Sequence, residues 1–173
     1  MPSKPTHAVA TITDITVLPS AGPWPAKSDG LLKVLFGLDF TTLTTKYLRY
    51  QDAELTAIGR DVRGLRSYSV KKLKNKAIGA DEWHRLRIEL VFVVRGSINW
   101  TCEDVYGQQQ EYIIDQTTGV WTPPFILHTY EALQDDTEIL VVANTLFFPD
   151  DASTHDTYSA IDFKLLQAQY TNS

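Results

Sequence analysis

The sequence predicts an all-β fold, a β-barrel of short strands that ends in one short helix. Turn-forming residues divide the chain into about ten short segments rich in β-branched and aromatic residues. A nearly continuous apolar run at residues 88–94, broken by Gly96, is typical of a strand that is buried on both faces. A helical pattern comes only near the end of the chain. This combination favours a barrel over alternating strands and helices.

Residues 1–29 are expected to form an N-terminal arm, and residues 30–173 a single domain. The arm is rich in proline and contains one β-prone segment, residues 10–18, in which Thr alternates with Ile and Val. Such an arm is suited to pairing with a second copy of the chain, because open strand edges favour pairing. We therefore expect a homodimer.

The strands expected in the domain are short and separated by turns. They are residues 31–40, 45–50, 65–73, 88–94, 97–102, 111–114, 126–133 and 137–144. In the third of these segments Arg66 and Tyr68 share one face, because side chains alternate along a strand. Ser159 and Asp162 resemble a capping box that opens the helix, which we expect at residues 161–170.

Composition and charge argue against several classes of protein. The chain has 173 residues, and its formal net charge of −5 comes without a large basic block, which argues against nucleic acid as a partner. Cys102 is the single cysteine, so no disulfide framework or cysteine-based zinc site is expected. The first residues lack the apolar run of a signal peptide, and no segment is apolar for the roughly 20 residues of a membrane span. We expect a cytoplasmic protein.

Two short stretches carry most of the functional signal. The first contains Glu82 and His84 and reaches Glu89 at the start of the apolar run, and the second, Pro-Pro-Phe-Ile-Leu-His, ends at His128. Glu82 and His84 are two residues apart, so on a strand their side chains point to the same wall. Glu89 is five residues beyond His84. We expect that a β-bulge is needed to turn Glu89 to that wall as well.

These stretches resemble the two motifs of the cupins, β-barrels of the jelly-roll type. Glu89 followed by six residues and a glycine fits the first motif, and Pro123 and His128 keep the proline-to-histidine spacing of the second. Glu82 replaces the first histidine of the first motif, and Phe125 replaces a glycine of the second. The resemblance implies a cupin barrel in which the motif residues line one apolar cavity.

Among the cupins, the chain resembles the sugar 3,4-ketoisomerases, which act on dTDP-4-keto-6-deoxyglucose. Both have a Pro-Pro-x-x-x-His segment, and Arg66-Ser67-Tyr68 stands sixteen residues before Glu82-Trp83-His84-Arg85, as an R-x-Y strand precedes their H-A-H-K motif. The resemblance covers about residues 63–166, and segment 154–158 is similar to the close of related polysaccharide-biosynthesis cupins.

The resemblance implies a keto shift on a sugar ring, which moves protons between neighbouring carbons through an enediol. A neutral histidine or a carboxylate can perform such transfers. The expected catalytic residues are His84, Glu82, Tyr68 and His128, and the expected substrate-binding residues are Arg66, Glu89, Tyr130 and Trp121. No cofactor is expected, and metal is expected to bind weakly or not at all. If a metal is present, its expected ligands are His84, Glu89 and His128.

Three functions remain open at the level of sequence. The first is a nucleotide-sugar isomerase or epimerase that acts on a 4-keto-6-deoxyhexose nucleotide in polysaccharide or deoxysugar biosynthesis. The second is a metal-dependent, dioxygenase-like cupin, because two histidines and one carboxylate can hold a transition metal. The third is a non-catalytic cupin that binds a sugar. The fold alone does not separate the three.

Overall fold

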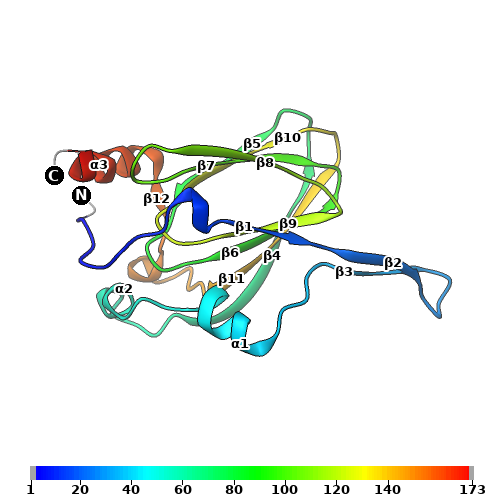
Figure 1. Cartoon of the computed structure of the whole chain (residues 1–173), viewed down its shortest axis with the longest axis horizontal. Coiled ribbons are helices and arrows are strands. Elements are labelled where there is room, and N and C mark those ends of the chain that lie inside the picture. Colours follow the sequence, from blue (N-terminus) through cyan, green and yellow to red (C-terminus); the bar gives the residue numbers. More distant parts are fainter. Residues whose placement is uncertain (1–2, 172–173) are drawn as a thin grey trace.

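A computed structural model describes residues 3–171, which form two β-sheets stacked face to face, with helices at their outer sides (Figure 1). The strands are β1 (Thr16–Pro19), β2 (Ala21–Pro25), β3 (Leu31–Val34), β4 (Arg63–Leu73), β5 (Ile78–Trp83), β6 (Glu89–Arg95), β7 (Ile98–Glu103), β8 (Gln109–Ile114), β9 (Thr118–Thr122), β10 (Leu127–Ala132), β11 (Thr137–Thr145) and β12 (Tyr158–Ser159). The first sheet has the order β1-β9-β6-β11-β4 and the second β12-β5-β10-β7-β8. The predicted all-β fold is confirmed, as two facing sheets rather than one closed cylinder.

The core lies between the two sheets, because the inward side chains of their strands are apolar. Val91 and Val93 of β6 belong to one buried cluster with Trp100 of β7. The outward residues of β6, Leu90 and Phe92, are buried as well, in a second cluster under the helical segment that follows β3. The predicted run is therefore buried on both faces over residues 88–93, and only its last residue, Val94, is exposed.

That helical segment was not expected from the sequence. It consists of α1 (Phe40–Thr42), a π-helical turn (Leu43–Tyr47) and α2 (Asp52–Ala57). Asp39 caps α1, since its Oδ1 accepts a hydrogen bond of 2.9 Å from the backbone N–H of Thr42. The ring of Tyr47 then packs edge-on against Trp121, with ring centroids 5.1 Å apart. The prediction of a strand at 45–50 is wrong, because capping and burial of Tyr47 favour a helix there.

The N-terminal segment is only partly strand. Residues 12–14 form a 3-10 turn, so the strand expected at 10–18 begins only at Thr16, where β1 pairs with β9 at the edge of the first sheet. β2 and β3 form a separate hairpin that projects from the body of the molecule (Figure 1). The boundary expected at residues 29 and 30 falls in the turn of this hairpin.

The C-terminal helix is confirmed as α3 (Ala160–Thr171). Ser159 and Asp162 cap it reciprocally, with Asp162 N–H donating to Ser159 Oγ at 3.2 Å and Ser159 N–H to Asp162 Oδ2 at 3.3 Å. Phe163 of this helix packs on Trp83 at the end of β5. Within residues 3–171 no helix is long and apolar enough to span a membrane. The cytoplasmic location stays a prediction.

Candidate functional site

The two motifs meet between the sheets. Glu82 lies on β5 and pairs in register with His128 of β10, so both belong to the second sheet. His84 follows the end of β5, and Glu89 begins β6 in the first sheet. The connection between β5 and β6 thus crosses from one sheet to the other and brings Glu89 opposite His84. The expectation that Glu89 needs a β-bulge is wrong, because the chain between these residues is a turn and not a strand.

A buried carboxylate far along the sequence holds this turn in place. Asp156 accepts hydrogen bonds from the backbone N–H groups of Arg85, Leu86 and Arg87, at 2.9, 2.8 and 2.7 Å. These three donors would otherwise be buried without partners. Sequence reasoning did not identify Asp156 as a site residue, and its only signal was the similarity of segment 154–158 to related cupins.

Four side chains converge on one small volume. The Nε2 atom of His84 lies 3.5 Å from Glu89 Oε1 and 3.7 Å from Glu82 Oε1, and the Nε2 atom of His128 lies 3.5 Å from Glu89 Oε2. Both Nε2 atoms are buried, and within residues 3–171 neither has a hydrogen-bond partner. Two nitrogen atoms with unused hydrogen-bonding capacity therefore face a buried carboxylate. This geometry is typical of a reactive or ligand-binding centre rather than of a packed core.

The other ring nitrogens favour a proton on the outer side of each ring. His128 Nδ1 lies 3.0 Å from the carbonyl oxygen of Ile126, and His84 Nδ1 lies 2.6 Å from that of Asp156. An N–H at Nδ1 donates to these carbonyls and leaves a lone pair on Nε2. Arg87 Nη2 lies 2.9 Å from His84 Nδ1 and competes for this atom. The shorter contact, with the carbonyl, favours a proton at Nδ1.

Electrostatics separate the roles of the buried groups. Burial, with a smaller contribution from the Arg87 guanidinium, lowers the pKa of His84 to about 3. Burial alone raises the pKa of Glu89, but its contacts with His84, His128 and Arg87 outweigh that effect and hold its pKa below the usual range. At neutral pH the site therefore combines an unprotonated His84 with an ionised Glu89.

Tyr68 and Arg87 both contact the carboxylate of Glu89. The Tyr68 hydroxyl donates a hydrogen bond of 2.7 Å to Glu89 Oε1, and burial raises the pKa of Tyr68 far above its usual value. Arg87 Nη1 lies 3.3 Å from the same carboxylate oxygen. Arg87 was not among the residues expected at the site, since its position between two apolar residues in the motif gave no sign of its direction.

Two of the expected substrate-binding residues lie beside the centre. Arg66 is half-buried on β4, with its guanidinium 5.3 Å from the Tyr68 ring centroid and its Nε atom without a partner. Tyr130 is half-buried on β10, and its hydroxyl covers Gly79, where a Cβ atom would lie 2.2 Å from that oxygen. Arg66 therefore lies beside Tyr68, and Tyr130 shares a face of β10 with His128.

Trp121 does not join the other site residues. Its neighbours in β9 face inward: Val120 lies in the core, and Thr122 accepts a hydrogen bond from Trp100. The alternation of side chains along the strand therefore turns Trp121 to the outer face of the sheet, against Tyr47. The prediction that Trp121 binds the substrate at the His84 centre does not fit its position between the sheet and the helical segment.

The centre also has the donor atoms of a metal site. His84, His128, Glu89 and Glu82 each offer one ligand atom, and these atoms lie within 4.8 Å of one another. Two imidazole nitrogens and two carboxylates suit a first-row transition metal, and the Nδ1 contacts with backbone carbonyls are the usual support for metal-binding histidines. The residues fit a metal better than the sequence suggested, because Glu89 faces the histidines without a bulge.

Phe125 gives the second motif its shape. It occupies the motif's glycine position and has a left-handed backbone with φ of 65°. Its N–H donates a hydrogen bond of 2.7 Å to the backbone carbonyl of His84, and its ring is 1% exposed. The buried ring and this hydrogen bond hold a conformation that residues with a Cβ atom rarely adopt.

We expect the variant Phe125→Gly to be more stable than Phe125→Ala. Both lose the packing of a buried ring, about 3–5 kcal/mol, but only alanine keeps the strain of the left-handed conformation, about 1–2 kcal/mol. Urea unfolding measures the difference. At the matched position Leu127, an ordinary strand residue, the order should reverse. An alanine variant at 125 more stable than the glycine variant would contradict the role assigned to this conformation.

No protein-family model and no curated protein matches the chain in sequence. Among solved structures, it is similar to the sugar 3,4-ketoisomerase QdtA of Thermoanaerobacterium thermosaccharolyticum, at 13% identity and a TM-score of 0.60 over 92% of this chain and 98% of that chain. It is also similar to the TDP-fucose-3,4-ketoisomerase WlaRA of Campylobacter jejuni, at 15% identity and a TM-score of 0.58 over 91% and 96% of the two chains. A third, the 3'-monoepimerase ChmJ of Streptomyces bikiniensis, gives 13% identity and a TM-score of 0.57 over 89% and 72%. The chain therefore shares the fold of these sugar isomerases and epimerases.

Proposed function

We propose that this protein is a nucleotide-sugar isomerase or epimerase that acts on a 4-keto-6-deoxyhexose nucleotide in deoxysugar or polysaccharide biosynthesis. The observation that carries the proposal is the pair of unpartnered histidine Nε2 atoms of His84 and His128 against the buried carboxylate of Glu89. The comparison supports the choice of substrate, since structures of QdtA contain TDP or TDP-4-keto-6-deoxyglucose.

The proposed reaction needs a base and an acid beside the sugar ring. A proton leaves the hydroxyl-bearing carbon next to the carbonyl, and the carbonyl oxygen gains a proton to give an enediol. The other hydroxyl of the enediol then loses its proton to become the new carbonyl, while the former carbonyl carbon gains a proton, which completes the shift. His84 is unprotonated at neutral pH and takes the first proton through Nε2. The Glu89 carboxylate, 3.5 Å away, stabilises the imidazolium that forms.

The remaining residues have supporting roles in this proposal. The His84 imidazolium returns its proton to the former carbonyl carbon. His128, through the lone pair on Nε2, or the partly exposed Glu82 carries the proton from the hydroxyl to the former carbonyl oxygen, since both lie beside His84. Tyr68 orients Glu89 through its hydrogen bond. Arg66, with a half-buried guanidinium at the edge of the first sheet, binds the diphosphate of the substrate, because arginine matches phosphate geometry well. Tyr130 contacts the sugar.

The test is exchange of solvent deuterium into the sugar. The protein is incubated in D2O with TDP-4-keto-6-deoxyglucose and related 4-keto-6-deoxy sugar nucleotides, and products are analysed by mass spectrometry against a blank without protein. Enzyme-dependent deuterium uptake at the carbons beside the carbonyl is expected. If these nucleotides raise the melting temperature without any exchange, the protein is a sugar-binding cupin. No effect of any of them would refute the proposal.

A metal-dependent cupin is the second candidate, and the convergence of four ligand atoms favours it. In that case His84, Glu89 and His128, with Glu82, hold the ion, and the metal supplies Lewis-acid or redox chemistry when bound. Metal analysis of protein purified without added metal distinguishes the candidates. A stoichiometric transition metal that is lost in Glu89→Ala would support this second reading, and its absence together with deuterium exchange would support the first.

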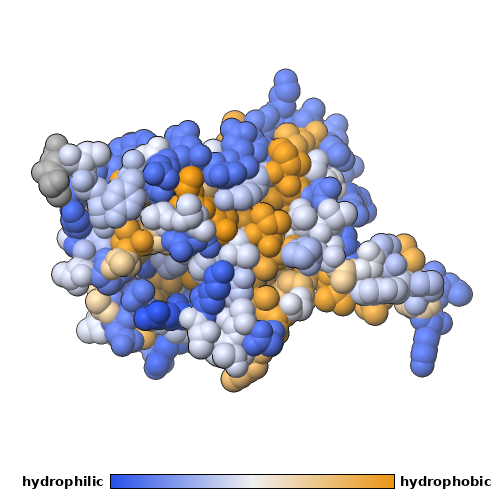
Figure 2. Space-filling view, viewed as in Figure 1, coloured by the Kyte–Doolittle hydropathy of each residue, from blue (hydrophilic) through white to orange (hydrophobic). Residues whose placement is uncertain are grey.

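We also propose that the protein forms a homodimer through the β2–β3 hairpin. The hairpin projects from the body, and Trp24 and Leu31 on it are 47% and 74% exposed. Apolar side chains also show at its base (Figure 2). A second copy would cover this surface.

We expect light scattering to give twice the chain mass of 19.5 kDa at micromolar concentration. The double variant Trp24→Ser, Leu31→Ser should shift the mass toward that of a monomer, because it removes the apolar surface of the hairpin. Ile113→Ser, an exposed apolar residue on β8, serves as the control. A wild-type mass of 19.5 kDa would exclude the dimer.

A further inference from the structure

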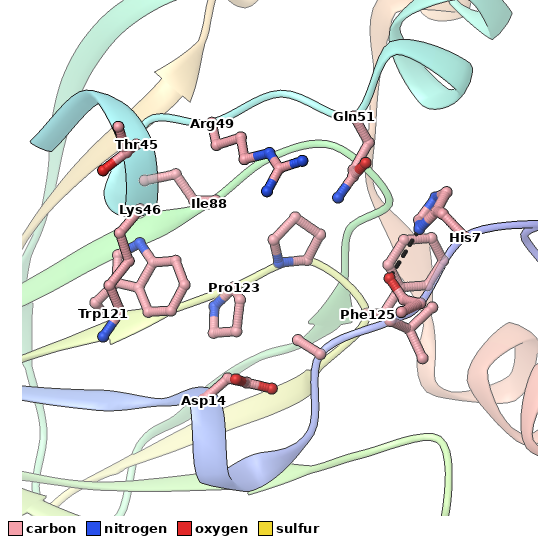
Figure 3. Close-up of a pocket in the computed structure, with 14 residues that line it drawn as sticks. His7, Asp14, Thr45, Lys46, Arg49, Gln51, Ile88, Trp121, Pro123 and Phe125 are labelled. Carbon is pink, nitrogen blue, oxygen red and sulfur yellow. Dashed lines mark hydrogen bonds between the residues drawn. The ribbon is translucent and has the colours of Figure 1, made fainter. Parts of the chain in front are cut away.

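A cavity lies outside the His84 centre, on the far side of the segment 121–125. It has a volume of about 330 Å³ and three walls: the N-terminal segment 7–14, the helical segment around Lys46 and Arg49, and the end of β9 with the following prolines (Figure 3). Its volume is at the lower end of the range for small-molecule sites. His84, Glu89 and His128 are not among its lining residues.

One side of this cavity is apolar. Trp121, Ile88 and Phe125 are almost fully buried, and each presents part of its surface to the cavity together with Pro123 and Pro124. Figure 3 shows the indole of Trp121 and the ring of Pro123 on this wall. Flat rings and proline faces suit the packing of a flat, apolar body.

The opposite side carries positive charge that lacks a counter-ion. Arg49 and Gln51 point into the cavity (Figure 3), and within residues 3–171 neither side chain has a hydrogen-bond or ion-pair partner. Lys46 lies beside Trp121, with Nζ 5.8 Å from the indole centroid and 3.1 Å from Thr16 Oγ1. A guanidinium and an amide that converge over an apolar wall can donate several hydrogen bonds to one anionic group.

The acidic residue of the cavity does not neutralise these charges. Asp14 Oδ2 accepts hydrogen bonds from the N–H and Oγ1 of Thr11, at 2.9 and 3.3 Å, as part of the 3-10 turn. The cavity therefore has two cations, Lys46 and Arg49, and one carboxylate, which is already hydrogen-bonded to Thr11. The charge balance favours an anion as the ligand.

We propose that this cavity is a second binding site, which takes a small organic anion with a flat apolar body and one carboxylate or phosphate group. The body lies on Trp121 and the prolines, and the anionic group accepts hydrogen bonds from Arg49 and Gln51, with Lys46 nearby. The site does not depend on the reaction proposed at the His84 centre.

Isothermal titration with benzoate and with phenyl phosphate tests the site and separates a carboxylate from a phosphate ligand. Benzyl alcohol keeps the ring without the charge, and inorganic phosphate keeps the charge without the ring. We expect at least one aromatic anion to bind, and both controls to bind at least roughly 10-fold more weakly. Benzyl alcohol lacks the charge-assisted hydrogen bonds, and inorganic phosphate lacks the apolar ring that packs on Trp121. Equal binding of inorganic phosphate, or binding of neither aromatic anion, would overturn the proposal.

Two variants on the exposed segment test the assigned residues. Arg49→Gln should weaken binding roughly 10- to 100-fold, and Gln51→Glu should also weaken it because a carboxylate repels the anion. Arg95→Gln, which removes an exposed arginine on β6, is the matched control and should bind as the wild type does. Unchanged affinity in Arg49→Gln would overturn the proposal. Binding that is lost in His84→Ala but kept in Arg49→Gln would place the anion between the sheets and overturn it as well.

Discussion

Replacement of His84 by alanine is expected to lower the rate of deuterium exchange by roughly 10²–10⁴-fold, the usual contribution of a positioned general acid or base. His84 is the one residue that contacts Glu82, Glu89 and the Arg87 guanidinium at once. Its Nε2 atom has no partner among the described residues, so the lone pair is available to the substrate. Affinity for the nucleotide should change much less, because Arg66 and Tyr130 remain.

The measurement compares exchange rates with binding constants for the same nucleotide. His84→Gln, which keeps most of the side-chain volume, should lose exchange to a similar degree and so exclude a packing effect as the cause. His155→Ala is the matched control, since His155 stacks on Phe147 and does not contact the centre. Exchange at the wild-type rate in a folded His84→Ala variant would mean that another residue is the base.

The sequence indicated which residues belong to the centre better than it indicated how they are arranged. Glu82 and His84 were expected on one wall, because motif spacing and side-chain alternation are local properties. Glu82 lies on β5, in register with His128 of β10, and His84 directly follows β5. The orientation of Glu89 was not predictable in this way. It depends on a turn held by Asp156, which is sixty-seven residues further along the chain (156 − 89). Hydrogen bonds over such separations leave no periodic signal.

The same limit explains Trp121 and the helical segment. Trp121 was expected to bind the substrate, but the pleat of β9 turns it outward. Residues 45–50 are rich in β-prone threonine and tyrosine, yet Asp39 caps a helix before them. The two features belong together, since Tyr47 of that segment covers Trp121. At this surface, tertiary packing outweighs the β propensity of residues 45–50.

Replacement of Asp156 by alanine is expected to lower the free energy of unfolding by about 3 kcal/mol or more, since three buried N–H donors lose their acceptor and each costs about 1–3 kcal/mol. The same change should abolish exchange, because the turn at residues 85–87 sets the position of both His84 and Glu89. Asp156→Asn keeps one carbonyl oxygen, which can still accept the bonds from Leu86 and Arg87. Its loss of stability should be smaller, and part of the activity should remain.

Urea unfolding and deuterium exchange, measured on the same preparations, test this role of Asp156. Asp151→Ala is the matched control: its carboxylate is only partly buried and caps a short turn through Ser153, so its loss should cost about 1 kcal/mol and leave exchange intact. Equal stability of the alanine variants at 156 and 151 would contradict the role assigned to Asp156. A stable Asp156→Ala variant without exchange would show that the carboxylate positions the centre but contributes little to the stability of the fold. We expect both the free energy of unfolding and the exchange rate to decrease in the order wild type, Asp156→Asn, Asp156→Ala. This order would show that the buried turn sets the geometry of the histidine–glutamate centre.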